Sequence, residues 1–127
     1  MELGTIRYHA LAKEGAWVDA PWEDQEVAKV ADKVFCFLSD TWIGVKCAPS
    51  REEADEWLHR FPDDATPMPY LRQHGWNSLR LHGGIPDDQL EEAVDESYRL
   101  VVDGLPVARR PHGWSAVTGE ATGQEAQ

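Results

Sequence analysis

Three short β-like segments follow one another at residues 26–30, 34–38 and 42–47, with only three residues between neighbours. This spacing is typical of two consecutive tight hairpins, which join antiparallel strands into a meander. In the last segment Ile43, Val45 and Cys47 occupy alternate positions, the period of two expected of a strand with one buried face. Because that face needs cover, the rest of the chain must supply elements that pack against it.

Helical signals flank the meander. Residues 3–12 fit a short helix that ends near Gly15, since glycine accepts the left-handed conformation common at helix C-termini. After the meander, Ser50 and Glu53 form a capping box, and apolar residues recur at helical spacing up to Phe61. The proline that follows ends this second helix, because the residue before a proline disfavours helical conformation.

The last helix has the strongest pattern. It begins with Pro86 in the first helical position, followed by two aspartates that complement the positive end of the helix dipole. Gly104 and Pro106 end it. Its apolar stripe comprises Leu90, Ala93, Val94, Ser97, Tyr98 and Val101. The stripe predicts a helix with one buried face.

A fourth strand and two irregular segments lie between these elements. Residues 76–81 read as a strand whose alternate residues lie on opposite faces. Residues 15–25 lack a period and contain a proline, which predicts an ordered loop held by Trp17 and Trp22. Residues 62–69 are rich in proline and read as a connector.

The sequence therefore predicts an α+β fold in which an antiparallel sheet, the three-stranded meander plus the later strand, packs against helices. The expected order is α-β-β-β-α-β-α. A chain of 127 residues can bury one core but not two. We expect this domain to span residues 1–108. In residues 109–127 large apolar groups are too sparse to offset the entropy of ordering, so a flexible tail is predicted.

The charge balance narrows the classes of function. Twelve Lys and Arg against 23 Asp and Glu give a net charge of −11, which repels phosphate backbones and anionic membrane surfaces. A general coat protein for DNA is therefore excluded. No apolar run approaches the roughly 20 residues that span a bilayer, and the first residues lack the basic and apolar regions of a secretion signal. We expect a soluble, cytoplasmic protein with no membrane partner.

The sequence offers little for catalysis. It contains no nucleophile elbow, phosphate-binding loop or dinucleotide fingerprint, and its five histidines include no pair spaced to hold a metal. The acidic clusters at residues 52–56 and 91–96 lie opposite apolar stripes, as solvated helix faces do. Cys36 should face residues 43–45 across its hairpin, which leaves Cys47 out of register for a disulfide. We expect reduced, buried thiols, no enzymatic activity, no cofactor and no metal.

One stretch has a local excess of positive charge. Residues 66–82 contain Arg72 and Arg80 and no acid, whereas residues 51–65 contain two Arg and six acids. Cations, aromatic rings and amides together suit contacts to phosphates and stacking on bases. The candidate binding residues are Lys46, Tyr70, Arg72, His74, Trp76, Asn77, Arg80 and Tyr98; His82 belongs to the same patch, and Lys29 and Lys33 are possible extensions of it.

Most of the candidates also have a purely structural interpretation. Trp76 could belong to the core, Asn77 could satisfy backbone groups, and the two arginines could pair with acidic helices. Ser97 and Tyr98 could serve as buried hydrogen-bonding groups, with the serine bonded to a carbonyl one turn back on its helix. Both interpretations stay open from the sequence alone.

Several strings, taken in order, resemble the MmcQ/YjbR family of small bacterial proteins. They are Pro21-Trp22, Val-Ala-Asp-Lys-Val-Phe at residues 30–35, Val-Lys-Cys-Ala-Pro at 45–49, Trp-Asn-Ser-Leu at 76–79, Ile-Pro-Asp at 85–87, Ser-Tyr-Arg-Leu-Val at 97–101 and Leu105-Pro106. The likeness covers about residues 13–106. One position departs from it, since Gln73 replaces a lysine that the family usually carries three residues before the tryptophan.

The resemblance implies an α+β domain with no agreed reaction or cofactor. Members are commonly labelled DNA-binding proteins of a double-wing type, by structural analogy. We therefore expect a non-enzymatic binding domain that contacts DNA weakly and in a salt-sensitive manner. The alternative is an acidic protein-interaction or small-ligand adaptor with no nucleic-acid role, which the net charge favours. A third possibility is an enzyme that uses Ser97, Tyr98 or Lys46.

Overall fold

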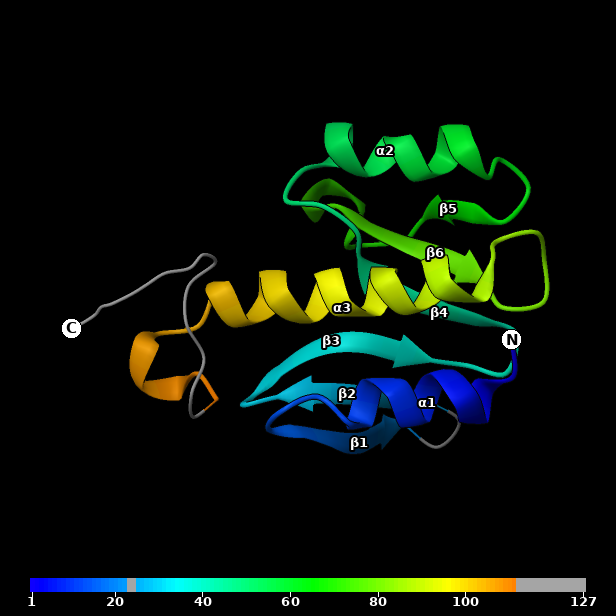
Figure 1. Cartoon of the computed structure of the whole chain (residues 1–127). Helices are drawn as coiled ribbons and strands as arrows, with labels where there is room; N and C mark the ends of the chain where they lie inside the picture. The colour runs from blue at the N-terminus through cyan, green and yellow to red at the C-terminus, as the bar shows by residue number, and fades with distance from the viewer. Residues whose placement is uncertain (23–24, 112–127) are drawn as a thin grey trace.

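The computed structural model describes residues 1–22 and 25–111 and shows one α+β domain (Figure 1). Three helices, α1 (Leu3–Leu11), α2 (Arg51–Arg60) and α3 (Asp87–Asp103), accompany six strands: β1 (Ala16–Trp22), β2 (Gln25–Val30), β3 (Lys33–Leu38), β4 (Trp42–Lys46), β5 (Ala65–Pro67) and β6 (Trp76–Arg80). Short 3₁₀ turns, η1 (Arg72–His74) and η2 (Val107–Arg109), precede β6 and follow α3. Most of the predicted tail lies outside the described residues, so that expectation stays a prediction.

The strands form one antiparallel sheet in the order β1-β2-β3-β4-β6-β5. The predicted meander is confirmed as β2, β3 and β4, and the predicted later strand as β6. Cys36 lies opposite Val45, within the range expected from the hairpin spacing. Both cysteines are free and buried, as expected.

Two strands were not expected from the sequence. Residues 16–22 form the edge strand β1 and not a loop, because backbone pairing with β2 supplies an order that the side-chain pattern lacks. Pro21 is compatible with an edge strand, where one side of the backbone has no ladder partner. The connector contains the three-residue strand β5, which pairs with β6. The side chain of Trp22, the second predicted anchor, lies outside the described part of the chain.

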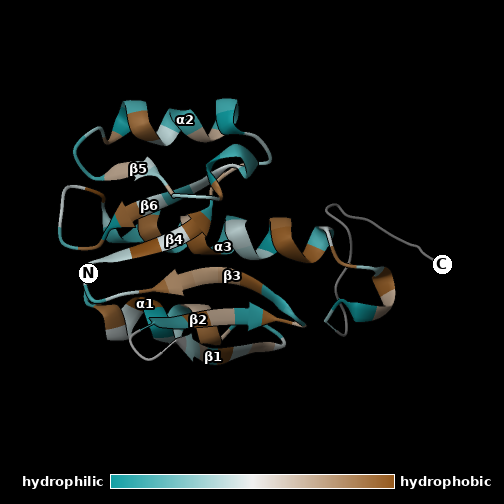
Figure 2. Ribbon diagram, turned by 180° about the vertical axis from the view of Figure 1, so that it is seen from behind, coloured by the Kyte–Doolittle hydropathy of each residue, from teal (hydrophilic) through white to brown (hydrophobic). Residues whose placement is uncertain are grey.

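All three helices cover one face of the sheet (Figures 1 and 2). Helix α3 crosses β3 and β4, α1 packs beside α3 and β1, and α2 packs on β5 and β6. Figure 2 views the opposite side, where the strands lie in front of α1 and α3. We call this helix-free side the open face. The same strands thus build a core on one side and present a surface on the other.

Helix α3 supplies much of the core. Leu90, Ala93, Val94, Ser97, Tyr98 and Val102 are its buried residues, so the predicted stripe is confirmed except that Val102 replaces Val101 as its last buried member. Pro86 is the residue that precedes the helix, one position outside the predicted start. Full burial of each large aliphatic side chain contributes about 1.5–3 kcal/mol.

A bulge in β3 brings an aromatic ring into this core. Ala28 pairs with Cys36 and Lys29 pairs with Val34, which leaves Phe35 as an extra residue in β3. Phe35 and Cys36 are both fully buried as a result. The Phe35 ring meets the Tyr98 ring edge-on, with 5.2 Å between centroids. The bulge therefore ties the meander to α3.

Ser97 joins α3 to both central strands. Its hydroxyl donates to the Phe35 carbonyl at 2.6 Å and accepts from the backbone N–H of Lys46 at 2.9 Å. The buried hydrogen-bonding role is confirmed, but the partner expected one turn back on the helix is wrong. The hydroxyl instead satisfies a carbonyl of β3 and an N–H of β4.

We predict that Ser97→Ala lowers the free energy of unfolding by about 2–3 kcal/mol, because it leaves buried backbone groups of two strands unsatisfied. Urea denaturation measures this change. Ser78→Ala is the matched control: Ser78 lies half-buried on the open face of β6, and its replacement should change stability by less than about 0.5 kcal/mol. Equal effects of the two substitutions would contradict the assigned role of Ser97.

Candidate functional site

The predicted binding residues do not gather in one patch. Lys46, His74 and Trp76 lie together at one end of the sheet, where they line a common pocket. Arg80 lines a different pocket, four residues further along β6. At the usual rise of about 3.3 Å per residue, roughly 13 Å separates the two ends. The remaining candidates are buried or point into solvent.

The pocket that contains Lys46 lies where β3 begins, β4 ends and α3 ends. We call it the sheet-end pocket; its volume is about 310 Å³, and it is lined by Lys33, Val34, Lys46, His74, Trp76, Leu100, Val101, Gly104 and Leu105. The lining contains two lysines and a histidine and no Asp or Glu. Its walls are otherwise apolar. Lys33, named above as a possible extension, belongs to it, whereas the contribution of α3 was not predicted.

Lys46 is held at the rim of this pocket by a backbone contact. Its ammonium group donates to the His74 carbonyl at 2.7 Å. Partial burial lowers the pKa of Lys46 below the ordinary value of lysine, because removal from water disfavours the charged form. The ammonium group has a neutral oxygen as its partner and retains donors for a further acceptor.

Trp76 closes the pocket as part of a packed surface. Only 7% of the residue is exposed, and its ring meets Phe37 at a tilt of 74° with 5.7 Å between centroids. A ring buried to this extent offers no free face for stacking. The core interpretation therefore describes Trp76 better than the stacking interpretation.

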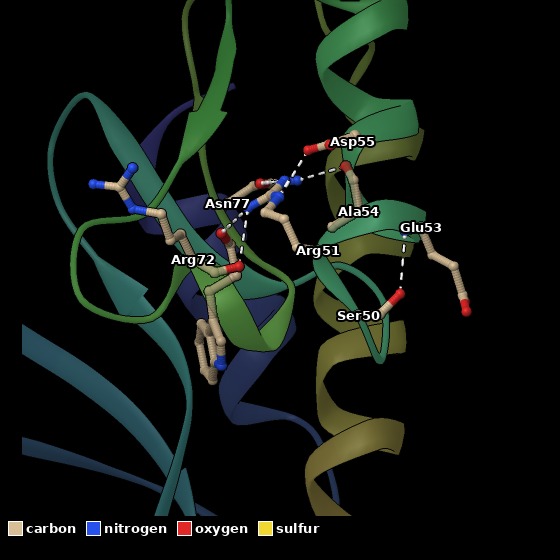
Figure 3. A network of polar contacts seen from close by, with 8 residues as sticks. Ser50, Arg51, Glu53, Ala54, Asp55, Arg72 and Asn77 are labelled. Atoms are coloured by element: carbon tan, nitrogen blue, oxygen red, sulfur yellow. Dashed lines mark hydrogen bonds and ion pairs between the residues drawn. The ribbon is translucent and has the colours of Figure 1, made fainter.

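Asn77 is a structural residue that holds α2 on the sheet (Figure 3). Its side chain is fully buried, donates to the Ala54 carbonyl at 3.0 Å and accepts from the Arg51 guanidinium at 2.6 Å. Arg51 also binds Asp55 at 2.7 Å and reaches the carbonyls of Arg72 and Trp76 at 3.3 and 3.2 Å. The Ser50 hydroxyl accepts from the backbone N–H of Glu53, which confirms the serine half of the predicted capping box. Asn77 thus satisfies buried polar groups, the structural alternative given above.

Tyr98 and Tyr70 occupy opposite extremes of exposure. Tyr98 is 5% exposed and its hydroxyl donates to the Glu14 carbonyl at 2.5 Å, while burial raises the pKa of its phenol. Tyr70 is 97% exposed and lines neither pocket. Arg72 is also exposed, and Figure 3 shows its side chain directed away from the Arg51 network. None of these three residues lines the sheet-end pocket, although Arg72 belongs to the same 3₁₀ turn as His74.

The second pocket lies on the open face at the other end of β4 and β6. We call it the open-face pocket; its volume is about 240 Å³, and it is lined by Thr41, Trp42, Asp63, Asp64, Thr66, Ser78 and Arg80. Arg80 forms an ion pair with Asp64 at 3.4 Å, and Asp64 also accepts from the backbone N–H of Gly84 at 2.8 Å. Of the other named cations, Lys29 pairs with Asp19 at 2.8 Å. His82 is exposed just beyond β6.

Comparison with known proteins places this fold among uncharacterised relatives. A family model described as YjbR matches residues 11–100. Two curated proteins, both described as uncharacterized protein YjbR, from Escherichia coli K12 and O157:H7, are each 28% identical over 116 residues, covering 87% of this chain and 95% of the relative.

Two solved structures share the fold. The Deinococcus radiodurans protein DR2400, described as a DUF419 domain, has a TM-score of 0.75 at 21% identity, with 85% of this chain and 84% of that chain covered. A Pseudomonas syringae protein has a TM-score of 0.60 at 19% identity, with 79% and 98% covered. Within the described residues, no helix is both long and apolar enough to cross a membrane. Those residues also contain no cluster of three or more groups suited to a metal ion.

We predict that Asn77→Ala lowers the free energy of unfolding by about 2–3 kcal/mol, because the Arg51 guanidinium and the Ala54 carbonyl both lose a buried partner. Arg72→Ala removes an exposed side chain from the same region and should change stability by less than about 0.5 kcal/mol. Chemical denaturation of both variants tests the assignment. A negligible effect of Asn77→Ala would return this residue to the list of binding candidates.

We also predict that neither thiol reacts while the protein is folded. Burial raises the pKa of Cys36 and Cys47 to about 12, which leaves roughly one thiolate in ten thousand thiols near pH 8. Ellman's reagent should modify both cysteines in urea and neither in buffer. Rapid labelling of either thiol in the native protein would contradict this assignment.

Proposed function

This chain belongs to the YjbR family, and we propose that it is a non-enzymatic binding domain whose sheet-end pocket contacts the phosphate groups of a nucleic acid. The resemblance described above supplies the class of ligand. The observation that carries the proposal is the charge of the pocket, whose lining has two lysines and no acid in a molecule of net charge −11. Phosphate contacts need such local excess positive charge.

Most cations of this protein are neutralised by neighbouring carboxylates. Among the described residues, those in ion pairs are Arg7, Lys13, Lys29, Arg51, Arg80, Arg99 and Arg109. Lys33 and Lys46, by contrast, have no carboxylate within ion-pair distance in the described part of the chain. Their charges are therefore available to a ligand, whereas binding through the paired cations would first have to displace an internal acid.

Two further cations lie close in the chain to residues of this pocket. Arg72 belongs to the same 3₁₀ turn as His74. Arg110 donates to the carbonyl of Leu105, a pocket residue, at 3.0 Å. Neither arginine has a carboxylate partner among residues 1–22 and 25–111. Arg60 is likewise without a carboxylate partner among the described residues but lies in the groove between α2 and α3, so the other four unpaired cations support the sheet-end pocket.

The arrangement of the hydroxyl groups supports a binding role over catalysis. The Ser97 hydroxyl is engaged by two backbone groups and the Tyr98 hydroxyl by a third. Neither of these two hydroxyls is therefore available as a nucleophile that Lys46 could activate. A general base needs a reacting group within hydrogen-bond reach, and these serine and tyrosine groups already have structural partners.

A basic protein partner is the second candidate function. A groove of about 410 Å³ lies between α2 and α3, and Glu92, Asp95 and Glu96 contribute to its lining. Two of these acids already pair with cations of this chain: Asp95 with Lys13, and Glu96 with Arg99. The groove is thus partly neutralised, which is why we favour the sheet-end pocket as the principal site.

We predict that Lys33→Gln and Lys46→Gln each lower the affinity for DNA several-fold at low salt, because each removes a phosphate contact. The slope of log affinity against log salt should become shallower by roughly 0.7–0.9 per lysine. Fluorescence anisotropy with a labelled DNA hairpin that carries a single-stranded overhang measures both quantities. This probe accepts either a duplex or a single-strand mode of binding.

Arg7→Gln is the matched control for these variants. It makes the same change in net charge, but Arg7 pairs with Glu26 on the helix-covered side. Its affinity should stay within about twofold of the unmodified protein. Absence of binding by the unmodified protein, or equal weakening by Arg7→Gln, would overturn the proposed function.

A further inference from the structure

We infer that the ligand is a single strand of nucleic acid that lies along β4 and β6 on the open face, with phosphates at the sheet-end pocket and an unpaired base on Trp42. This inference rests on the proposed function and names its ligand more closely. It is carried by the relation between the two pockets, which lie at opposite ends of the same pair of strands.

Strand alternation places the β4 and β6 residues of both pockets on the open face, and α3 completes the lining of the sheet-end pocket from the helix side of the sheet end. Lys46 pairs with Trp76 at one end of the β4–β6 ladder, and Trp42 pairs with Arg80 at the other. Residues at even spacing along a strand share a face, so these four side chains all lie on the side away from the helices. The separation of roughly 13 Å requires an elongated ligand if both pockets are occupied at once.

The buried side chain of Met68 fills the strip between the pockets, where it packs on Gly44. Gly44 lies midway along β4, and a Cβ atom there would stand 2.7 Å from the Met68 sulfur and 3.3 Å from the Phe37 Cβ. Met68 therefore lies directly on the strand, where any larger residue than glycine would displace it. Phe37 is half-buried beside it. Strand β4 adds no side chain of its own here, so a ligand that crosses the strip would contact Phe37 and Ser78 on either side of Gly44.

The open-face pocket suits a base better than a phosphate. Trp42 is half-buried in its wall and is accompanied by the hydroxyls of Thr41, Thr66 and Ser78. The carboxylates of Asp63 and Asp64 oppose a phosphate there but can accept hydrogen bonds from base N–H groups. An indole ring supplies a stacking surface that tolerates any base. The two pockets thus divide the recognition of backbone and base between them.

A duplex would not satisfy both pockets. Paired bases are stacked on one another, so their flat faces are unavailable to Trp42 unless the base leaves the stack. In a single strand the bases are exposed, and binding then combines a positively charged contact with aromatic stacking. In the lining of the sheet-end pocket, Lys33 and Lys46 are the positive charges without a carboxylate partner. Two phosphate contacts to a single strand give log affinity against log salt a slope of about −1.4, which is a weak salt dependence.

The test compares a labelled single strand of about eight nucleotides with a hairpin duplex without an overhang, by anisotropy at low salt. The single strand should bind more tightly. Trp42→Leu should weaken single-strand binding about tenfold, whereas Trp42→Phe, which keeps an aromatic ring, should weaken it less than threefold. The phenylalanine variant also guards against misfolding of the leucine variant, and circular dichroism of both confirms the fold.

Trp17→Leu is the matched control, since Trp17 is 44% exposed on the edge strand β1, where its ring lies 5.2 Å from the Lys29 ammonium. It should leave affinity for the single strand within about twofold. Duplex binding as tight as single-strand binding, or equal loss in the Trp17 and Trp42 leucine variants, overturns this inference and leaves the proposed function standing. Failure of the overhang hairpin to bind overturns both.

Discussion

The hydroxyl of Ser97 is the contact on which the arrangement of helix and sheet depends. Because a hydroxyl both donates and accepts, one buried side chain bonds β3 through Phe35 and β4 through Lys46. These two hydrogen bonds fix the position of α3 along the two central strands. The backbone of Lys46 is anchored from the helix side, while its ammonium group is directed to the open end of the sheet. A structural bond thus positions the residue that we propose for binding.

Local periodicity explains which elements the sequence could predict. The meander and α3 were predictable because their apolar residues follow the strand and helix periods over whole elements. Strand β1 was not, because an edge strand has one neighbour and half-exposed residues such as Trp17 and Val18, so its side chains carry no alternation. The bulge at Phe35 was likewise not predictable from the sequence, because an extra residue in one strand is recognised only when its pairing with the neighbouring strand is known.

The candidate site was predicted only in part, for a related reason. Composition marked the acid-free stretch from residue 66 to 82, but a strand sends successive side chains to opposite faces. The side chain of Asn77 therefore lies in the core. Arg80 lies at the end of the β4–β6 ladder opposite to Lys46, where Asp64 neutralises its charge. Lys33 comes to the pocket from another hairpin. Its pairing state depends on tertiary contacts that no spacing in the sequence encodes.

Strand β6 shows why structural and binding effects can be separated in this fold. Its inward residues, Asn77 and Leu79, are fully buried beneath the helices, whereas Ser78 and Arg80 face the open side. A substitution on the inward face acts on stability and reaches a ligand only by disturbing the fold. One at Ser78 or Arg80 acts on the open face at little cost to the core, unlike one at Trp76, which faces outward but is buried. Inward and outward side chains alternate along β6. Substitutions at adjacent positions can therefore be compared directly, because the backbone context is nearly constant and only the direction of the side chain differs.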